Sequence, residues 1–254
     1  MIESIVLLIV GILVGCFGTI IGVGGGFVIV PLLTIVYQFS PQHAVGTSMA
    51  IVALNAISGT IAYVRQKRID YKTGLLFASA TLPGSFLGAY LLQHISRPVF
   101  DIGFSIFMIA TAAYIGIRKQ NAVKEIDIAT FQRPNYSKPL GVVISFFVGF
   151  VASMAGIGGG VIHVPAMIYL FYFPPFIAIP TSHFILAISA TFAAASHASI
   201  GEVEWSFIPY LGTGAVIGAQ IGGMLSHRIK GKWIIRGLLT VMVLGAIRLI
   251  LRNI

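Results

Sequence analysis

Hydrophobic residues fill long, unbroken stretches of this chain, and polar residues collect in short segments between them. A stretch of about 20 mostly apolar residues is long enough to cross a bilayer as a helix. Eight stretches stand out, at 4–37, 43–64, 73–94, 99–117, 140–173, 177–200, 206–226 and 233–251. The pattern predicts an all-α protein that crosses the membrane several times.

The first apolar stretch of each half is too long for one crossing and is interrupted by glycines. Residues 21–31 read IGVGGGFVIVP, and residues 155–165 read AGIGGGVIHVP. Glycine lets the backbone turn where other residues cannot, and a broken membrane helix is tolerated where the break lines a cavity. Each stretch is therefore predicted to form a full helix, a glycine break and a shorter helix, which either completes a crossing or re-enters.

The two halves correspond at a constant spacing, because Gly156 follows Gly22 by 134 residues. The same spacing relates Gly24–Gly26 to Gly158–Gly160, Pro31 to Pro165, Thr47-Ser48 to Thr181-Ser182, and Gly84 and Gly88 to Gly218 and Gly222. A gapless series of matches in glycine, polar and loop positions indicates an internal duplication. Gly84, Gly88, Gly218 and Gly222 are spaced by four residues and predict close helix packing.

Loop charges predict that the two halves are inverted relative to each other. The loop at 65–72 is basic and its counterpart at 199–204 is acidic, whereas the loop at 95–101 is mixed and its counterpart at 227–232 is strongly basic. Because basic loops face the cytoplasm, equivalent loops lie on opposite sides. The predicted organisation is a repeat at 1–117, a cytoplasmic linker at 118–139 and an inverted repeat at 140–254.

Composition agrees with a membrane protein and narrows its partners. Only 9% of the residues are charged and 57% are hydrophobic, whereas soluble domains carry about 25% charged residues. The net charge of +9 would suggest nucleic acid for a soluble protein, but here the cations are topology signals, so no nucleic-acid partner is expected. Leu13–Cys16 looks like a lipoprotein cleavage box, but the basic leader of such signals is missing. The first helix is therefore expected to be retained in the mature protein. The lone Cys16 allows no disulfide within the chain.

Inverted repeats with broken helices are typical of secondary transporters, whose binding site lies between the repeats near the midplane. Free N–H groups at a helix start favour an anion, and the Thr-Ser hydroxyls that follow each break can donate to it. Asn55 lies on roughly the same helix face as Ser48. The predicted substrate-binding residues are Gly24, Gly25, Gly26, Thr47, Ser48, Asn55, Gly158, Gly159, Gly160, His163, Thr181, Ser182 and His183. The alternatives are close packing at the glycines and hydroxyl bonds to a carbonyl one turn back.

Three histidines make the halves unequal. His163 stands where the first half has Ile29, His183 where it has Met49, and His197 where it has Tyr63. Histidine titrates near neutral pH, so His163, His183 and His197 are candidates for proton coupling, and His163 or His183 could supply positive charge to an anion site. A metal site is the weaker alternative because no carboxylate accompanies them, and neither a metal nor a cofactor is expected.

No enzyme motif is present. Phe27 replaces the third glycine of a dinucleotide fingerprint, the glycine clusters lack the lysine of a phosphate loop, and no Gly-x-Ser-x-Gly occurs. The carboxylates sit in loops or near helix ends. An anion channel remains the alternative to a carrier, because both can be built from inverted repeats with paired breaks.

The paired Gly-x-Gly-Gly-Gly clusters with downstream proline, and the Gly46-Thr47-Ser48 of the next helix, resemble the TauE/SafE family of sulfite exporters over essentially the whole chain. The second half departs from this pattern, with Pro180 before Thr181-Ser182. The resemblance implies a plasma-membrane carrier that exports sulfite, sulfonates or related sulfur-containing anions. It does not specify the anion, which leaves thiosulfate or a carboxylate open, nor the coupling ion or the oligomeric state.

Overall fold

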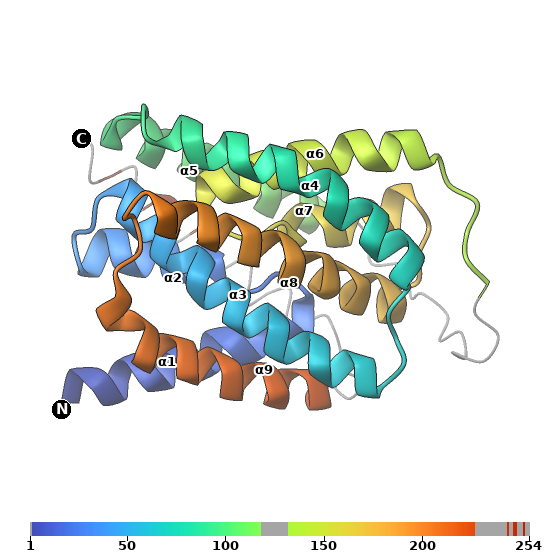
Figure 1. Ribbon diagram of the computed structural model, residues 1–254, viewed down its shortest axis with the longest axis horizontal. Coiled ribbons are helices and arrows are strands. Elements are labelled where there is room, and N and C mark those ends of the chain that lie inside the picture. The colour runs from blue at the N-terminus through green and yellow to red at the C-terminus, as the bar shows by residue number, and fades with distance from the viewer. Residues whose placement is uncertain (1, 118–131, 227–242, 244–245, 248–250, 252–254) are drawn as a thin grey trace.

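The computed structural model describes residues 2–117 and 132–226, with isolated positions at 243, 246–247 and 251. In these residues every regular element is helical (Figure 1). Six helices are long and apolar enough to cross a membrane: α1 (Ile2–Ile21), α3 (Pro41–Arg65), α4 (Tyr71–Leu92), α6 (Lys138–Ala155), α8 (Pro175–Ser199) and the stretch Trp205–Leu225. The prediction of an all-α, multi-span membrane protein is confirmed.

Two further stretches complete this picture. α5 (Arg97–Ile117) covers the segment predicted at 99–117. Trp205–Leu225 consists of η4 (Trp205–Phe207), η5 (Ile208–Gly212) and α9 (Thr213–Leu225). The segment predicted at 233–251 lies, apart from isolated positions, outside the described residues, as does most of the linker predicted at 118–139.

Both long first segments break at the predicted glycines. α1 is followed by α2 (Gly26–Pro31) and a π-helical turn, η1 (Leu32–Val36), and α6 by α7 (Gly160–Pro165) and a π-helical turn, η3 (Ala166–Leu170). The helix ends are alike, since Gly22 and Gly156 adopt left-handed conformations with φ of 81° and 68°. The next N–H then donates back to the carbonyl five residues earlier, which is the usual glycine termination of a helix.

The long helices form three layers around a central pair. α3 and α8 lie side by side and run in opposite directions in the middle of the molecule, with α1 and α9 on one side and α4 and α6 on the other (Figure 1). α9 packs on α3, and α4 packs on α8. The first helix of each half therefore pairs with the third long helix of the other half, so neither half forms a separate bundle.

Small residues allow these helix pairs to approach closely. A side chain at Gly84 would collide with the carbonyl oxygen of Phe146 on α6, and one at Gly218 with that of Ile12 on α1. Gly88 and Gly222 likewise face the backbones of Phe150 and Cys16. The predicted role of these four glycines in helix packing is confirmed, and each contact in one half recurs 134 residues later in the other.

Candidate functional site

The two glycine breaks meet at the centre of the molecule. A side chain at Gly26 would collide with the carbonyl oxygen of Gly156 and come within 2.8 Å of the Ile157 Cα. The counterpart Gly160 faces the carbonyl oxygen of Gly22 and would place a Cβ 2.7 Å from the Val23 Cα. Only glycine allows the backbones of the two halves to touch here.

The Thr-Ser pairs tie each glycine break to the opposite half. The Ser48 hydroxyl donates to the Gly156 carbonyl oxygen at 2.7 Å, and the Ser182 hydroxyl donates to that of Gly22 at 3.3 Å. Both serines are fully buried. Their bonds are therefore neither to a carbonyl one turn back nor to solvent but to the carbonyls left free where α6 and α1 end.

The neighbouring threonines bind the loops that follow α8 and α3. Thr47 accepts a hydrogen bond from the Glu204 N–H at 2.8 Å, and Thr181 accepts one from the Asp70 N–H at 2.9 Å. Each Thr-Ser pair thus joins a glycine break and a loop of the other half. The four hydroxyls form two equivalent sets of contacts rather than one cluster.

Asn55 and His183 lie in a second buried polar cluster, between α1, α3 and α8. The Thr19 hydroxyl lies 3.2 Å from Asn55 Oδ1 and 3.4 Å from His183 Nε2, and the Asn55 amide donates to the Gly15 carbonyl at 3.0 Å. The Tyr63 hydroxyl donates to the Thr19 carbonyl at 2.6 Å. Among the described residues, His183 Nδ1 has no hydrogen-bond partner although it is buried.

His163 lies apart from His183, on α7 beside the second glycine break. Its Nε2 is 3.1 Å from the Ser145 hydroxyl of α6, and its ring stacks on Phe77 of α4 with centroids 6.1 Å apart. The ring also borders Gly159, where a Cβ would lie 3.1 Å from His163 Nδ1. Both histidines are thus buried next to a duplicated motif, in different surroundings.

His197 has a carboxylate partner that the sequence did not reveal. Its Nδ1 lies 2.6 Å from Glu202 Oε2, and both residues are buried. The expectation that no carboxylate accompanies the histidines is wrong, because the loop after α8 folds back against its last turn. His43 and His94, by contrast, are exposed at helix ends.

The loop after α3, which corresponds to the loop after α8, contains a cation instead. Arg68 donates to the Phe176 carbonyl at 3.0 Å, to Gln66 at 2.9 Å and to Ser226 at 3.0 Å, and its guanidinium lies 5.6 Å from the centroid of the Tyr63 ring. Burial lowers the pKa of Arg68, against the opposing effect of Tyr63. An arginine keeps its charge in such surroundings.

Asp70, two residues further on, forms an ion pair with the linker. Arg133 donates to both carboxylate oxygens of Asp70, at 2.7 and 2.5 Å, and Thr73 donates to Oδ2 at 2.7 Å. Burial acts to raise the pKa of Asp70, but the bonds from Arg133 and Thr73 outweigh it and hold the pKa below its ordinary value of 3.8. The linker is thereby attached to the start of α4.

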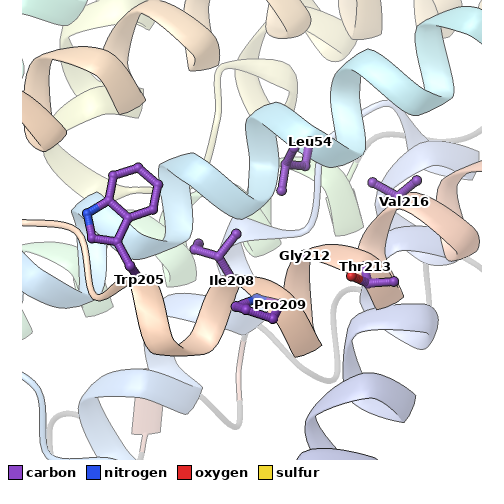
Figure 2. Close-up of a pocket in the computed structure, with 7 residues that line it drawn as sticks. All are labelled: Leu54, Trp205, Ile208, Pro209, Gly212, Thr213 and Val216. Atoms are coloured by element: carbon purple, nitrogen blue, oxygen red, sulfur yellow. The ribbon is translucent and has the colours of Figure 1, made fainter.

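An apolar pocket lies at a different place, between α3 and the stretch Trp205–Leu225. It has a volume of about 400 Å3 and is lined by Leu54, Trp205, Ile208, Pro209, Gly212, Thr213 and Val216 (Figure 2). Trp205 at its edge is 63% exposed. The lining offers no charged group and does not include the glycine breaks, so this pocket does not fit an anion.

The predicted site residues are thus divided among three places. The glycines lie at the break, to which Ser48 and Ser182 bind from opposite halves. Asn55 and His183 lie in the cluster with Thr19 and Tyr63, and His163 pairs with Ser145. Thr19 and Ser145 were missed, although a lone hydroxyl residue in an apolar stretch is a signal for a buried polar contact. Within the described residues, no three His, Cys, Asp or Glu side chains are grouped as they would be to hold a metal.

Comparison with known proteins agrees with this architecture. A family model described as sulfite exporter TauE/SafE matches residues 7–249. The chain is 35% identical to the probable membrane transporter protein YunE of Bacillus subtilis over 99% of both chains. It is 29% identical to the probable membrane transporter protein MJ0441 of Methanocaldococcus jannaschii, over 63% of this chain and 60% of that one. No solved structure matches. The chain belongs to the sulfite exporter TauE/SafE family and is a multi-pass transporter of the plasma membrane.

Proposed function

We propose that the protein is a secondary transporter that exports small sulfur-containing anions, such as sulfite or organosulfonates, by alternating access between two inverted repeats. The repeats are residues 1–117 and 140–254, joined by a cytoplasmic linker at 118–139. The anion binds between the two glycine breaks, where it contacts backbone N–H groups and the Thr-Ser hydroxyls. A proton is the proposed coupling ion, with His163, His183 and His197 as its candidate carriers.

The observation that carries this proposal is the direct contact between the two breaks. Gly26 and Gly160 begin their helices, so their N–H groups have no carbonyl one turn earlier in the same helix. Such N–H groups attract anions. Each of these two buried helix starts lies against the glycine break of the other half, with Ser48 beside the contact of Gly26 with Gly156 and Ser182 beside that of Gly160 with Gly22, so both halves supply donors along the break.

Helix directions support the inverted arrangement. α3 and α8 occupy equivalent places in the two halves, yet they run in opposite directions in the middle layer (Figure 1). The contacts of Ser48 with Gly156 and of Thr47 with Glu204 recur, 134 residues apart, as those of Ser182 with Gly22 and of Thr181 with Asp70. Equivalent contacts between oppositely directed helices are what two inverted repeats produce.

The described arrangement is closed at the breaks, so the transport cycle must separate them. When an anion enters, the Ser48 and Ser182 hydroxyls turn from the glycine carbonyls to the anion, which accepts their hydrogen bonds in place of those carbonyls. Opening toward one side breaks the Thr47–Glu204 contact, and opening toward the other breaks the Thr181–Asp70 contact. Exchange between these two states moves the anion without a continuous pore.

Flux measurements on purified protein in proteoliposomes test the proposal. Sulfite, ethanesulfonate, thiosulfate and acetate are offered separately as labelled anions, and saturable uptake with counterflow of sulfite or ethanesulfonate is expected. Large single-channel currents would instead establish a channel. If acetate but not sulfite were taken up, the substrate would be a carboxylate rather than a sulfur-containing anion. No uptake of any of the four anions would refute the proposed function.

Glycine variants test where the anion binds. Gly25→Val and Gly159→Val should abolish sulfite flux, because a branched side chain would fill the space beside each break. Gly103→Val is the matched control, since Gly103 lies on α5 with no atom within 4 Å of the place its Cβ would take. Normal flux in both break variants, with folding confirmed by thermal unfolding, would refute the site.

A further inference from the structure

A buried pair of titratable groups lies at one end of the central helix pair. His197, in the last turn of α8, has no exposed surface on its side chain, and the Glu202 side chain is 10% exposed. The two are joined by the 2.6 Å contact between Nδ1 and Oε2. In the described part of the chain, His197 Nε2 has no hydrogen-bond partner. Burying an ionisable pair in this way is costly, and the position of His197 on a membrane-spanning helix makes the pair a candidate for a functional role.

The other half has no titratable pair at the equivalent positions. Tyr63 stands for His197 and Arg68 for Glu202, each 134 residues earlier. Arg68 is as buried as Glu202, at 7% exposed, but it donates to three oxygens and lies over the Tyr63 ring. A guanidinium stays charged in the physiological range, so of the two equivalent residues Arg68 and Glu202 only Glu202 can take up a proton.

The other ionisable side chains near this end have their own partners. His43, at the start of α3, lies 2.9 Å from the Ser40 hydroxyl, and Glu204 of the same loop accepts a bond from Ser206 at 2.8 Å. Arg97 of α5 donates to the Thr34 carbonyl at 3.1 Å. The remaining ionisable groups of the helices that begin or end here are Glu3, His94 and Asp101.

The pair is linked to the candidate anion site by a short chain of contacts. The Glu202 carbonyl oxygen lies against Gly46, leaving no room for a side chain there, and the Glu204 N–H donates to Thr47. Ser48, the next residue, donates to the Gly156 carbonyl at the glycine break. Moving the loop away from α8 therefore releases the start of the Gly-Thr-Ser sequence that holds the break closed.

We propose that the His197–Glu202 pair binds the transported proton and that loading it opens the Glu202 end of the protein. The inference rests on the proposed transporter function. The proton passes from the solution to Glu202 Oε2, and the carboxylate becomes a carboxylic acid that no longer offers His197 an anionic acceptor. The loop then leaves Gly46 and Thr47. While the loop is open, the proton passes from Glu202 to His197, and the resulting imidazolium re-forms the ion pair with the Glu202 carboxylate as the loop closes. His197 Nε2, which has no partner among the described residues, then releases the proton to the other side. In the proposed orientation the Glu202 end faces the cell exterior, so inward release of the proton drives the anion outward.

Proteoliposomes with the membrane potential clamped by valinomycin and potassium test the coupling. Labelled ethanesulfonate is the probe, because a sulfonic acid stays ionised and responds to a pH gradient only through the protein. With one proton per cycle, a gradient of one pH unit should change the steady-state ethanesulfonate ratio about tenfold. For each variant, the rate of ethanesulfonate exchange at equal pH on both sides is also measured. This rate shows whether a variant that ignores the pH gradient still transports the anion.

Three variants separate the pair from its surroundings. Glu202→Gln and His197→Gln should bring the ethanesulfonate ratio under the pH gradient close to one, whereas Glu204→Gln in the same loop should keep the full response. A wild-type ratio that ignores the pH gradient, or a full response in Glu202→Gln, would overturn the proposal. Absence of any wild-type exchange of sulfite or ethanesulfonate would instead count against the proposed function.

Hydrogen exchange gives a second measurement that needs no substrate. After correction for intrinsic rates, the backbone amides of residues 200–204 should exchange faster as the pH falls in the wild type, because protonation frees the loop. Glu202→Gln should exchange fast at every pH, and Glu204→Gln should follow the wild type. Wild-type protection of the loop that does not change with pH would overturn the inference even if transport had not been detected.

Discussion

The loop after α3 and the loop after α8 take equivalent places at opposite ends of the molecule, yet they hold their helices by different chemistry. Arg68 closes one end through bonds to neutral oxygens and the Tyr63 ring, and Glu202 closes the other through His197. The backbone contacts around them are the same, since Asp70 and Glu204 each donate an N–H to a threonine of the other half. Equivalent positions in the two halves thus carry a guanidinium at one end and an imidazole–carboxylate pair at the other.

The glycine breaks show the same kind of difference within a shared frame. Gly22, Gly24 and Gly25 all have positive φ, whereas in the second half Gly156 and Gly158 do and Gly159, with φ of −66°, does not. His163 lies beside Gly159, at the place where the first half has Ile29. The backbone conformation at Gly25 therefore requires glycine, whereas that at Gly159 is one that other residues can adopt.

The largest expected effect separates the two breaks. Gly25→Ala should lower the free energy of unfolding by about 2–4 kcal/mol, because φ is 86° and the new Cβ would meet the Val14 side chain and its carbonyl oxygen. Gly159→Ala should cost only about 1 kcal/mol, since the Val148 side chain can move aside. Thermal unfolding in detergent measures both, with Gly103→Ala as the control. Equal losses would show that the breaks do not differ.

Arg68→Met should give the next largest loss, about 1.5–3 kcal/mol, because hydrogen bonds from a charged group are removed and partly buried oxygens lose a donor. Its effect should be the same at pH 6 and pH 8, since arginine does not titrate in this range. Arg65→Met, at an exposed position at the end of α3, is the control and should change little. If the loss of unfolding free energy in Arg68→Met changed between pH 6 and pH 8, the proposed difference between the Arg68 end and the Glu202 end would be wrong.

Asp70 and Glu204 hold equivalent positions, but their side chains have different partners. Their amide variants should therefore differ in the free energy of unfolding. Asp70→Asn should cost about 1 kcal/mol at pH 7, because Arg133 is partly exposed and solvent weakens the pair. The folded-state pKa of Asp70 lies below its ordinary 3.8, so its contribution is present above that value and is lost as the pH falls through the lower folded value. Wild type and Asp70→Asn should therefore converge in unfolding temperature on acidification.

The control for Asp70→Asn is Glu204→Gln. The Glu204 side chain accepts a bond from the exposed Ser206, and replacing it should leave the unfolding temperature almost unchanged. A gap between wild type and Asp70→Asn that widened toward acid pH would contradict the assigned sign.

The smallest difference is expected between the two serines at the breaks. Ser48→Ala should cost about 1 kcal/mol, since it removes a 2.7 Å bond to a buried carbonyl, and Ser182→Ala about 0.5 kcal/mol, since the equivalent bond is 3.3 Å. Thermal unfolding of the single variants and of the double variant measures both and shows whether they add. A larger loss at Ser182 would reverse the order.

The helices and their glycine breaks could be predicted from the sequence, because both depend on local physics. A bilayer requires about 20 apolar residues for each crossing, and glycine alone tolerates the left-handed ends at Gly22 and Gly156. The close packing at Gly84 and Gly218 could be predicted for the same reason, since glycines four residues apart form a bare stripe on a helix. The resemblance to the TauE/SafE family was drawn from the same paired motifs, and the family model that matches residues 7–249 confirms it.

The partners of the polar side chains were decided only by the tertiary structure. Ser48 and Gly156 are 108 residues apart, Ser182 and Gly22 are 160 apart, and the sequence contains no sign that a hydroxyl of one half binds a carbonyl of the other. Glu202 reads as a loop carboxylate until the chain folds it against His197. In a membrane protein a buried polar group must find a partner within the fold, and that partner is selected by which helices pack together, which here join the first helix of each half to the third long helix of the other.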